Sequence, residues 1–246
     1  MEHIISLPEY DTIAYLVAGL AALAAADLIF GTRTFFRADW SISVTTTVVI
    51  VALAVGHVVA LLSALLIENY GVNAFTSPPT TYLMEKDTCR QQSRLPIQYF
   101  SALDCSTQQK INDKLGREER TKDLKGSNLF WEAYNNAKQN DYAFKRIVTF
   151  HEQYNFSRNM SFVALLAAIT ILFRGKRGVR LGAAHAASHE IPKWVTRRWP
   201  LFAAFLFIGV VFFARYLYFY RAHSIEVLTS YAYAVEGDKK SSAEKN

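Results

Sequence analysis

Four long apolar stretches constrain the fold of this chain more strongly than any other feature of its sequence. They cover residues 13–29, 44–67, 162–173 and 201–217. A helix needs about 20 mostly apolar residues to cross the hydrocarbon core of a bilayer. The first, second and fourth stretches reach that length, and the third reaches it when its polar start from Tyr154 is included. The sequence therefore predicts an all-α membrane protein with four transmembrane helices.

These helices divide the chain into two transmembrane hairpins with a polar segment between them. We expect an N-terminal hairpin in residues 1–67 and a small, mainly helical extramembrane domain in residues 68–155, inserted between spans 2 and 3. A C-terminal hairpin with a helical extension follows in residues 156–235. The predicted spans are about 11–31, 43–67, 156–173 and 200–220. The polar residues 236–246 have the composition of a disordered tail.

The polar segment is expected to rest on helical extensions of the third and fourth spans. A segment of about 90 residues forms only a marginal domain by itself. Apolar residues continue at helical spacing before the third span, at Phe144 and Ile147, and after the fourth, at Ile225 and Leu228. Two long helices are therefore predicted to carry the extramembrane domain.

Two serines are placed as N-caps of helices within this domain. The hydroxyl of an N-cap serine accepts a hydrogen bond from a backbone N–H of the first turn. We expect Ser106 to cap a helix over residues 107–115 and Ser127 to cap a helix over residues 128–138.

The positive charges of the two short loops predict the orientation of the spans. Short loops rich in Lys and Arg stay on the cytoplasmic side, whereas long domains cross the membrane largely regardless of charge. Loops 31–43 and 174–199 carry nine such residues, and only Asp39 and Glu190 oppose them. We therefore expect both termini and residues 68–155 on the non-cytoplasmic side of a cell membrane. Basic residues that weaken this bias flank the opposite ends of spans 3 and 4, namely Lys145, Arg146, Arg158, Arg215 and Arg221.

The same distribution of charge argues against nucleic acid as a partner. The net charge of +6 is concentrated in the two loops instead of covering one face of the protein. In the second loop, basic residues beside Trp194 and Trp199 are expected to contact anionic lipid headgroups. These residues are Arg174, Lys176, Arg177, Arg180, Arg197 and Arg198. The lipid bilayer is thus the first predicted partner.

Both cysteines of the chain, Cys89 and Cys105, lie in the polar segment. In an oxidising compartment, a disulfide between them would close a loop of 16 residues and stabilise the domain by about 3 kcal/mol. In a reducing compartment both would remain thiols. The sequence leaves these two alternatives open.

Small residues recur at every fourth position of span 2. The ladder consists of Ala52, Gly56, Ala60 and Ala64 and lies on one face of the helix. Such ladders let two helix backbones approach closely where no hydrophobic effect drives association. We expect the ladder to pack against the alanine-rich first span in a tight hairpin. The competing interpretation assigns it to contacts between copies, which would give a homo-oligomer.

Three ionisable residues are predicted to lie at membrane depth, namely Asp27, His57 and Arg215. Charge is costly there, and such residues are functional candidates by default. His57 is the strongest candidate, because it lies far inside an apolar span. Its imidazole could be neutral and bonded to another helix, or it could act as a proton relay or pH sensor.

Asp27 and Arg215 also have structural interpretations. Asp27 lies near the cytoplasmic end of span 1, within reach of Arg33 or of the hydroxyl groups of Thr45–Thr47. Arg215 is long enough to extend to the outer headgroups, where Glu68 at the end of span 2 could meet it.

The sequence contains no motif that indicates catalysis. We find no P-loop, nucleophile elbow or CxxC motif, and His185 and His189 lack the further ligands of a zinc site. No cofactor or metal is therefore expected. The preferred hypothesis is a non-enzymatic multi-pass membrane protein that self-associates and acts as a sensor, partner subunit or membrane-perturbing effector. Its partner, either another copy or a membrane or soluble protein, would contact residues 68–155. The alternative is an oligomeric channel or transporter with a polar path through His57 and Arg215.

Overall fold

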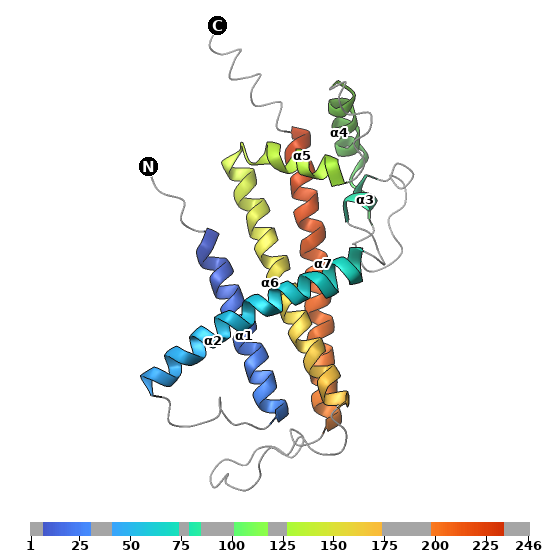
Figure 1. Cartoon of the computed structure of the whole chain (residues 1–246). Helices are drawn as coiled ribbons and strands as arrows, with labels where there is room; N and C mark the ends of the chain where they lie inside the picture. Colours follow the sequence, from blue (N-terminus) through green and yellow to red (C-terminus); the bar gives the residue numbers. More distant parts are fainter. Residues whose placement is uncertain are drawn as a thin grey trace. The chain divides into compact units, whose positions relative to one another are not determined.

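The computed structural model describes residues 7–30, 41–73, 79–84, 101–117, 127–173 and 198–233. Within these ranges the chain forms helices joined by short turns, and none of the ranges contains a strand (Figure 1). The helices are α1 (Leu7–Phe30), α2 (Ile42–Ser63), the π-helix η1 (Ala64–Asn73), α3 (Pro79–Leu83), α4 (Cys105–Arg117), α5 (Ser127–Ala137), α6 (Asp141–Phe173) and α7 (Arg198–Tyr233).

Four helical segments of the described chain are long and apolar enough to cross a membrane. They are Thr12–Phe30, Ile42–Asn73, Asp141–Phe173 and Trp199–Tyr233. The prediction of an all-α chain with four helices of membrane-spanning length is therefore confirmed for the described residues. These helices suggest a membrane location and are compatible with a multi-pass membrane protein.

The chain divides into two compact units, which we describe separately. Unit 1 comprises residues 1–71 and 155–216, and unit 2 comprises residues 72–154 and 217–246. The helices α6 and α7 are uninterrupted, and each contributes residues to both units.

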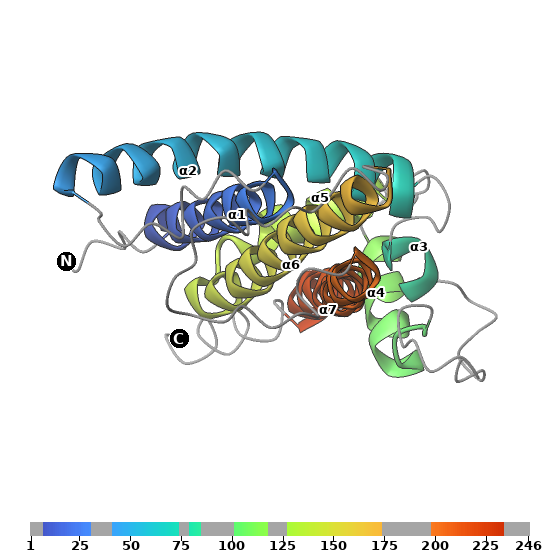
Figure 2. The same cartoon turned by 90° about the horizontal axis from the view of Figure 1, so that it is seen from below.

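In unit 1, α2 crosses α1 in close contact (Figures 1 and 2). Two glycines make this approach possible. A Cβ atom on Gly19 would lie 1.7 Å from the carbonyl oxygen of Ala52, and one on Gly56 would lie 1.9 Å from that of Tyr15. Neither gap has room for a side chain, so the two helices touch backbone to backbone, as small residues allow in membrane helices.

The apolar part of α6 lies inside unit 1. Ala167 and Ile171 are buried against Ala25 and Ile29 of α1 and Leu201 of α7. The outer faces of α2 and α7 are different, because they expose many large apolar side chains. Examples are Ile50, Val58, Leu61, Phe207 and Val210.

Unit 2 has a hydrophobic core of its own, to which α3, α4, α5, α6 and α7 all contribute. The core consists of Leu83, Leu103, Ile111, Leu129, Ala133, Ala137, Ile147, Val227, Leu228 and Tyr231. On α5 the buried residues are four positions apart, which is the spacing of one helix face. At the edge of the core, the Lys114 ammonium donates a hydrogen bond of 3.1 Å to the carbonyl oxygen of Tyr231.

The helix caps of unit 2 differ in part from those predicted. Asp104, and not Ser106, caps α4, and the helix begins at Cys105 instead of Thr107. The carboxylate of Asp104 accepts hydrogen bonds from the Ser106 hydroxyl and from the backbone N–H of Thr107. These hydrogen bonds lower the pKa of Asp104, and the bond from Ser106 has the largest effect. Aspartate is as good an N-cap as serine, and its carboxylate here accepts from the residues two and three positions later. The second predicted helix begins at Ser127 and ends at Ala137.

Several sequence predictions concern residues outside the described ranges. They are the disordered tail 236–246, the partner cysteine Cys89, and the loop residues Arg174, Lys176, Arg177, Arg180 and Arg197. Arg198 is the first residue of α7, and Cys105 lies at an exposed position in the first turn of α4.

Candidate functional site

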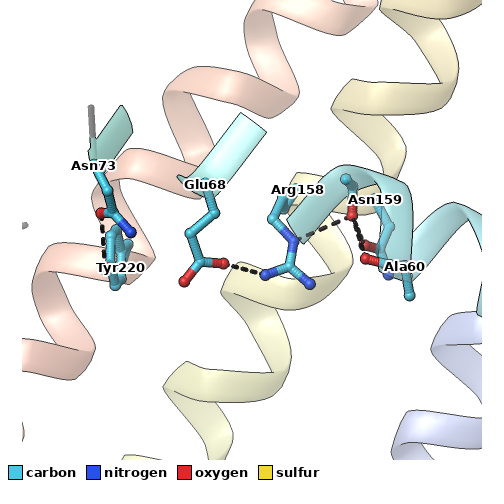
Figure 3. A network of polar contacts seen from close by, with 7 residues as sticks. Ala60, Glu68, Asn73, Arg158, Asn159 and Tyr220 are labelled. Carbon is cyan, nitrogen blue, oxygen red and sulfur yellow. Dashed lines mark hydrogen bonds and ion pairs between the residues drawn. The ribbon is translucent and has the colours of Figure 1, made fainter. Parts of the chain in front are cut away.

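A cluster of polar side chains lies inside unit 1, where the end of α2 meets α6 (Figure 3). The Ser63 hydroxyl lies 2.6 Å from the Asn159 side-chain oxygen and 3.0 Å from the carbonyl oxygen of Ala60. Its single proton can serve one of these acceptors at a time. The Nε of Arg158 donates to the Ser63 hydroxyl oxygen over 3.2 Å, and the guanidinium forms an ion pair with Glu68. We call Ser63, Glu68, Arg158 and Asn159 the polar cluster.

The local backbone explains how these residues come together. Arg158 and Asn159 are neighbours on α6, and Ser63 is the last residue of α2. Glu68 follows five residues later in η1, whose i→i+5 hydrogen bonds give a wider turn than that of an α-helix. In such a turn, residues five apart lie closer to the same face of the helix than they do in an α-helix. The π-helix therefore lets Ser63 and Glu68 both reach Arg158.

The polar cluster is shielded from its surroundings. Ser63 and Asn159 are fully buried, and the side chains of Arg158 and Glu68 are 9% and 20% exposed. Two further groups, the Asn159 side-chain nitrogen and the Ser157 hydroxyl, are buried without a hydrogen-bond partner among the described residues. Buried charges are expensive to desolvate, and an ion pair recovers this cost only with good geometry and added hydrogen bonds. Ser63 supplies one such bond.

The position of the cluster along its helices bears on its role. Ser63 lies about 32 Å along the helix from Ile42, and Asn159 lies about 21 Å from Phe173, at about 1.5 Å per residue. The hydrocarbon core of a bilayer is about 30 Å thick. If the spans begin near Ile42 and Phe173, the cluster lies in the far part of the core or at its edge, where a charged pair marks a functional candidate.

The predicted helix-packing residues occupy two environments. Ala52 and Gly56 are buried against α1, whereas Ala60 is half-buried and lies beside Ser63. Ala64 is half-buried and is the first residue of η1.

The three ionisable residues singled out at membrane depth differ in their exposure to solvent. Asp27 is buried, whereas His57 and Arg215 are exposed. The Nδ1 atom of His57 lies 2.8 Å from the carbonyl oxygen of Leu53 in its own helix, and its ring centroid lies 4.6 Å from that of Tyr15. The imidazole is thus engaged mainly within the α1–α2 pair.

Sequence reasoning missed Arg158 as the partner of Glu68. It treated Arg158 only as a flanking charge and considered Glu68 as a partner of Arg215. The segment Ser157–Ser161, in which four of five residues are polar and which the third span must include to reach membrane length, indicates polar groups within this span but not the residues they contact.

Unit 1 also contains a cavity between its helices. The cavity has a volume of about 160 Å³, lies between α1, α2 and α6, and is lined almost entirely by apolar side chains such as Ala22, Phe30 and Val163. The described residues contain no group of three His, Cys, Asp or Glu side chains that could hold a metal ion. Comparison with protein-family models, curated proteins and solved structures finds no match to this chain.

Proposed function

We propose that the chain is a non-enzymatic multi-pass membrane protein in which unit 1 is the membrane anchor and unit 2 is an extramembrane helical domain that binds a protein partner. In this role the protein acts as a sensor or partner subunit. The observation that carries the proposal is the length of α6 and α7. Each is an uninterrupted helix, and each has one part in the apolar-surfaced unit and one part in the unit with its own core.

The helix lengths support an extension beyond the bilayer. With 33 and 36 residues, α6 and α7 are about 50 and 54 Å long at about 1.5 Å per residue. A hydrocarbon core of about 30 Å leaves roughly 20 Å of each helix outside it. These outer parts contain the residues that contribute to unit 2 and its hydrophobic core, including Ile147 and Leu228.

The surface of unit 1 supports its role as the anchor. Large apolar side chains are exposed along α2 and α7. On a protein in water, large exposed apolar patches mark surfaces that contact a membrane or another protein. The polar cluster then holds the end of α2 against α6 near the outer edge of the membrane.

Two exposed aromatic side chains in unit 2 support partner binding. Trp131 on α5 is 58% exposed and Tyr142 on α6 is 72% exposed, although both are large aromatic side chains. Tryptophan and tyrosine are enriched among the residues that dominate binding energy at protein interfaces. Trp131 also lies opposite the buried face of α5, so it is not needed for the core.

Site-specific photo-crosslinking in intact membranes tests the proposal. A photoreactive residue at position 131 or 142 should capture one and the same protein, whereas the same residue at Leu166, which is 49% exposed in unit 1, should capture lipid. Crosslinks between two copies would identify the partner as the chain itself. Capture of lipid alone from positions 131 and 142 would contradict the proposal, as would release of the protein from membranes by alkaline carbonate.

The same preparation separates this function from that of a channel. Purified protein in a planar bilayer is expected to carry no current. A conductance that disappears in His57→Ala or Arg215→Ala, with the variants still folded, would favour the channel instead.

A further inference from the structure

We propose that His223 is an acid-sensitive lock in unit 2, and that a proton added to its imidazole opens the contact between α7 and the helices α5 and α6. This inference goes beyond the proposed function, because it concerns the internal packing of unit 2 and does not depend on the identity of any partner. It also names a residue that was not among the candidates from the sequence.

His223 lies in a box of aromatic rings. Its ring centroid is 5.8 Å from that of Phe130 and 6.4 Å from that of Tyr134, both on α5. On α6, the rings of His151 and Tyr154 each lie 5.5 Å away. His223 itself is only 5% exposed. We call these five residues the His223 box.

Neither ring nitrogen of His223 has a hydrogen-bond partner within the described residues. A neutral imidazole can pack in these surroundings like the other aromatic rings. An imidazolium has two N–H donors, and it would lose its hydration here without gaining an acceptor. Burial without a partner strongly disfavours a charged group. The closed box therefore accepts the neutral form of His223 and rejects the protonated form.

The charged and titratable groups around the box do not offset this penalty. From α5, Tyr134 faces His223, and burial raises the pKa of its hydroxyl, so it stays neutral. Lys138 lies 4.8 Å from the Tyr134 ring centroid and adds positive charge. From α6, His151 would also be positive if protonated. One turn along α7, the carboxylate of Glu226 lies 3.0 Å from Arg146 and is engaged there.

Two tyrosine hydroxyls complete the surroundings of the box. Tyr154 faces His223 from α6, and Tyr220 precedes His223 by three residues on α7, with its ring 5.3 Å from that of Tyr154. Tyrosine is neutral in the pH range in which histidine titrates. Neither residue therefore supplies a countercharge to an imidazolium.

The direction of the pH effect follows from the protons that each state binds. A solvated histidine takes up a proton as the pH falls through about 6.5. The open state of unit 2 can accept that proton and the closed state cannot, so acid favours the open state. The box has its full stability above about pH 6.5 and loses it as the pH falls. Between pH 7.5 and 5.5, the ratio of closed to open molecules is expected to fall about tenfold.

Hydrogen–deuterium exchange of the full chain in lipid nanodiscs tests the lock. After correction for the pH dependence of chemical exchange, amides of α5 and of residues 141–154 should open about tenfold more often at pH 5.5 than at pH 7.5. His223→Phe keeps an aromatic ring in the box and removes the titrating group, so its exchange should be the same at both pH values. An unchanged wild-type rate would overturn the proposal, and so would a tenfold response that persists in His223→Phe.

A matched control shows whether the response belongs to His223. His57→Phe is the same substitution at an exposed histidine of unit 1 and should leave the full response of unit 2 intact; its loss in this variant would contradict the assignment. If His223→Phe does not fold, His223→Leu provides the same comparison. Equal acceleration across α1, α2 and unit 2 in the wild type would place the acid sensitivity elsewhere and overturn the lock.

Discussion

Unit 1 and unit 2 are built from the same kind of secondary structure but are held together in opposite ways. In unit 1, Gly19 and Gly56 bring two backbones into contact, polar groups are buried, and large apolar side chains cover the outside. In unit 2, the inside is an apolar core and α5 turns one apolar face toward it. Burial of apolar surface stabilises a protein in water but does little between helices in lipid.

One helix serves both kinds of packing. α6 presents Arg158 and Asn159 to α2 in unit 1, and it presents Ile147 to the core of unit 2. Its sequence changes accordingly from an amphipathic pattern to a nearly continuous apolar run. Four substitutions can distinguish the packing of unit 1 from that of unit 2.

Arg158→Met should have the largest effect and should act on unit 1. It leaves Glu68 as a partly buried charge without its partner, which is expected to cost about 4 kcal/mol in the free energy of unfolding. Reversible unfolding in mixed micelles measures this. The double variant Arg158→Met with Glu68→Met removes both charges and should recover most of the loss. A single variant as stable as the wild type would mean that the polar cluster does not hold α2 to α6.

Leu228→Ala should have the next largest effect and should act on unit 2. It deletes a fully buried side chain from the core, which is expected to cost about 3 kcal/mol. Hydrogen exchange should therefore accelerate in α4 and α5 while α1 and α2 stay protected. Leu206→Ala, at a position of the same helix that is 39% exposed, is the control and should change little. Equal loss of protection in both units would erase the proposed distinction.

Gly56→Ala should destabilise the contact between α1 and α2 by about 2 kcal/mol, because the helix backbones must separate to admit one methyl group. Gly71→Ala is the matched control, since its Cβ would meet nothing closer than 3.2 Å. Thermal unfolding in detergent measures both. If the two variants have the same melting temperature, the close backbone approach is not what stabilises unit 1.

Asp104→Ala should have the smallest effect, about 1 kcal/mol, through loss of the N-cap of α4 in unit 2. Because the pKa of Asp104 is lowered in the folded state, its carboxylate contributes stability above the ordinary value near 3.9, and this contribution is lost as the pH falls further. The difference between Asp104→Ala and the wild type should therefore be present at pH 7 and shrink below about pH 4. A difference that is constant from pH 7 to pH 3 would show that the cap does not act through its charge.

The long helices could be predicted from the sequence because apolar length is a local property. Apolar residues at helical spacing, such as Ile147 before span 3 and Leu228 after span 4, also indicated that α6 and α7 continue beyond the apolar stretches. The N-cap of α4 was placed two residues late, because Asp104 and Ser106 are both suitable caps and only the hydrogen bonds distinguish them.

The polar cluster and the His223 box could not be predicted, because they depend on contacts between residues far apart in the chain. Periodicity gives the face of a helix but not the helix that it meets. The ion pair of Glu68 with Arg158 also requires the π-helical turn of η1, which no local signal in the sequence indicated. His223 stands in a stretch of mixed polarity, and only the packing of α5 and α6 encloses it.

Spin-label accessibility tests directly the proposal that α6 and α7 extend out of the bilayer from unit 1 into unit 2. Single cysteines would be placed at exposed positions of both helices in a Cys89→Ser, Cys105→Ser background, in nanodiscs. The positions are Leu166 and Phe207 in unit 1, and Tyr142 and Tyr233 in unit 2. We predict that labels at 166 and 207 collide with oxygen dissolved in lipid, and that labels at 142 and 233 collide with a water-soluble nickel chelate. The same collision partner at all four positions would contradict this proposal.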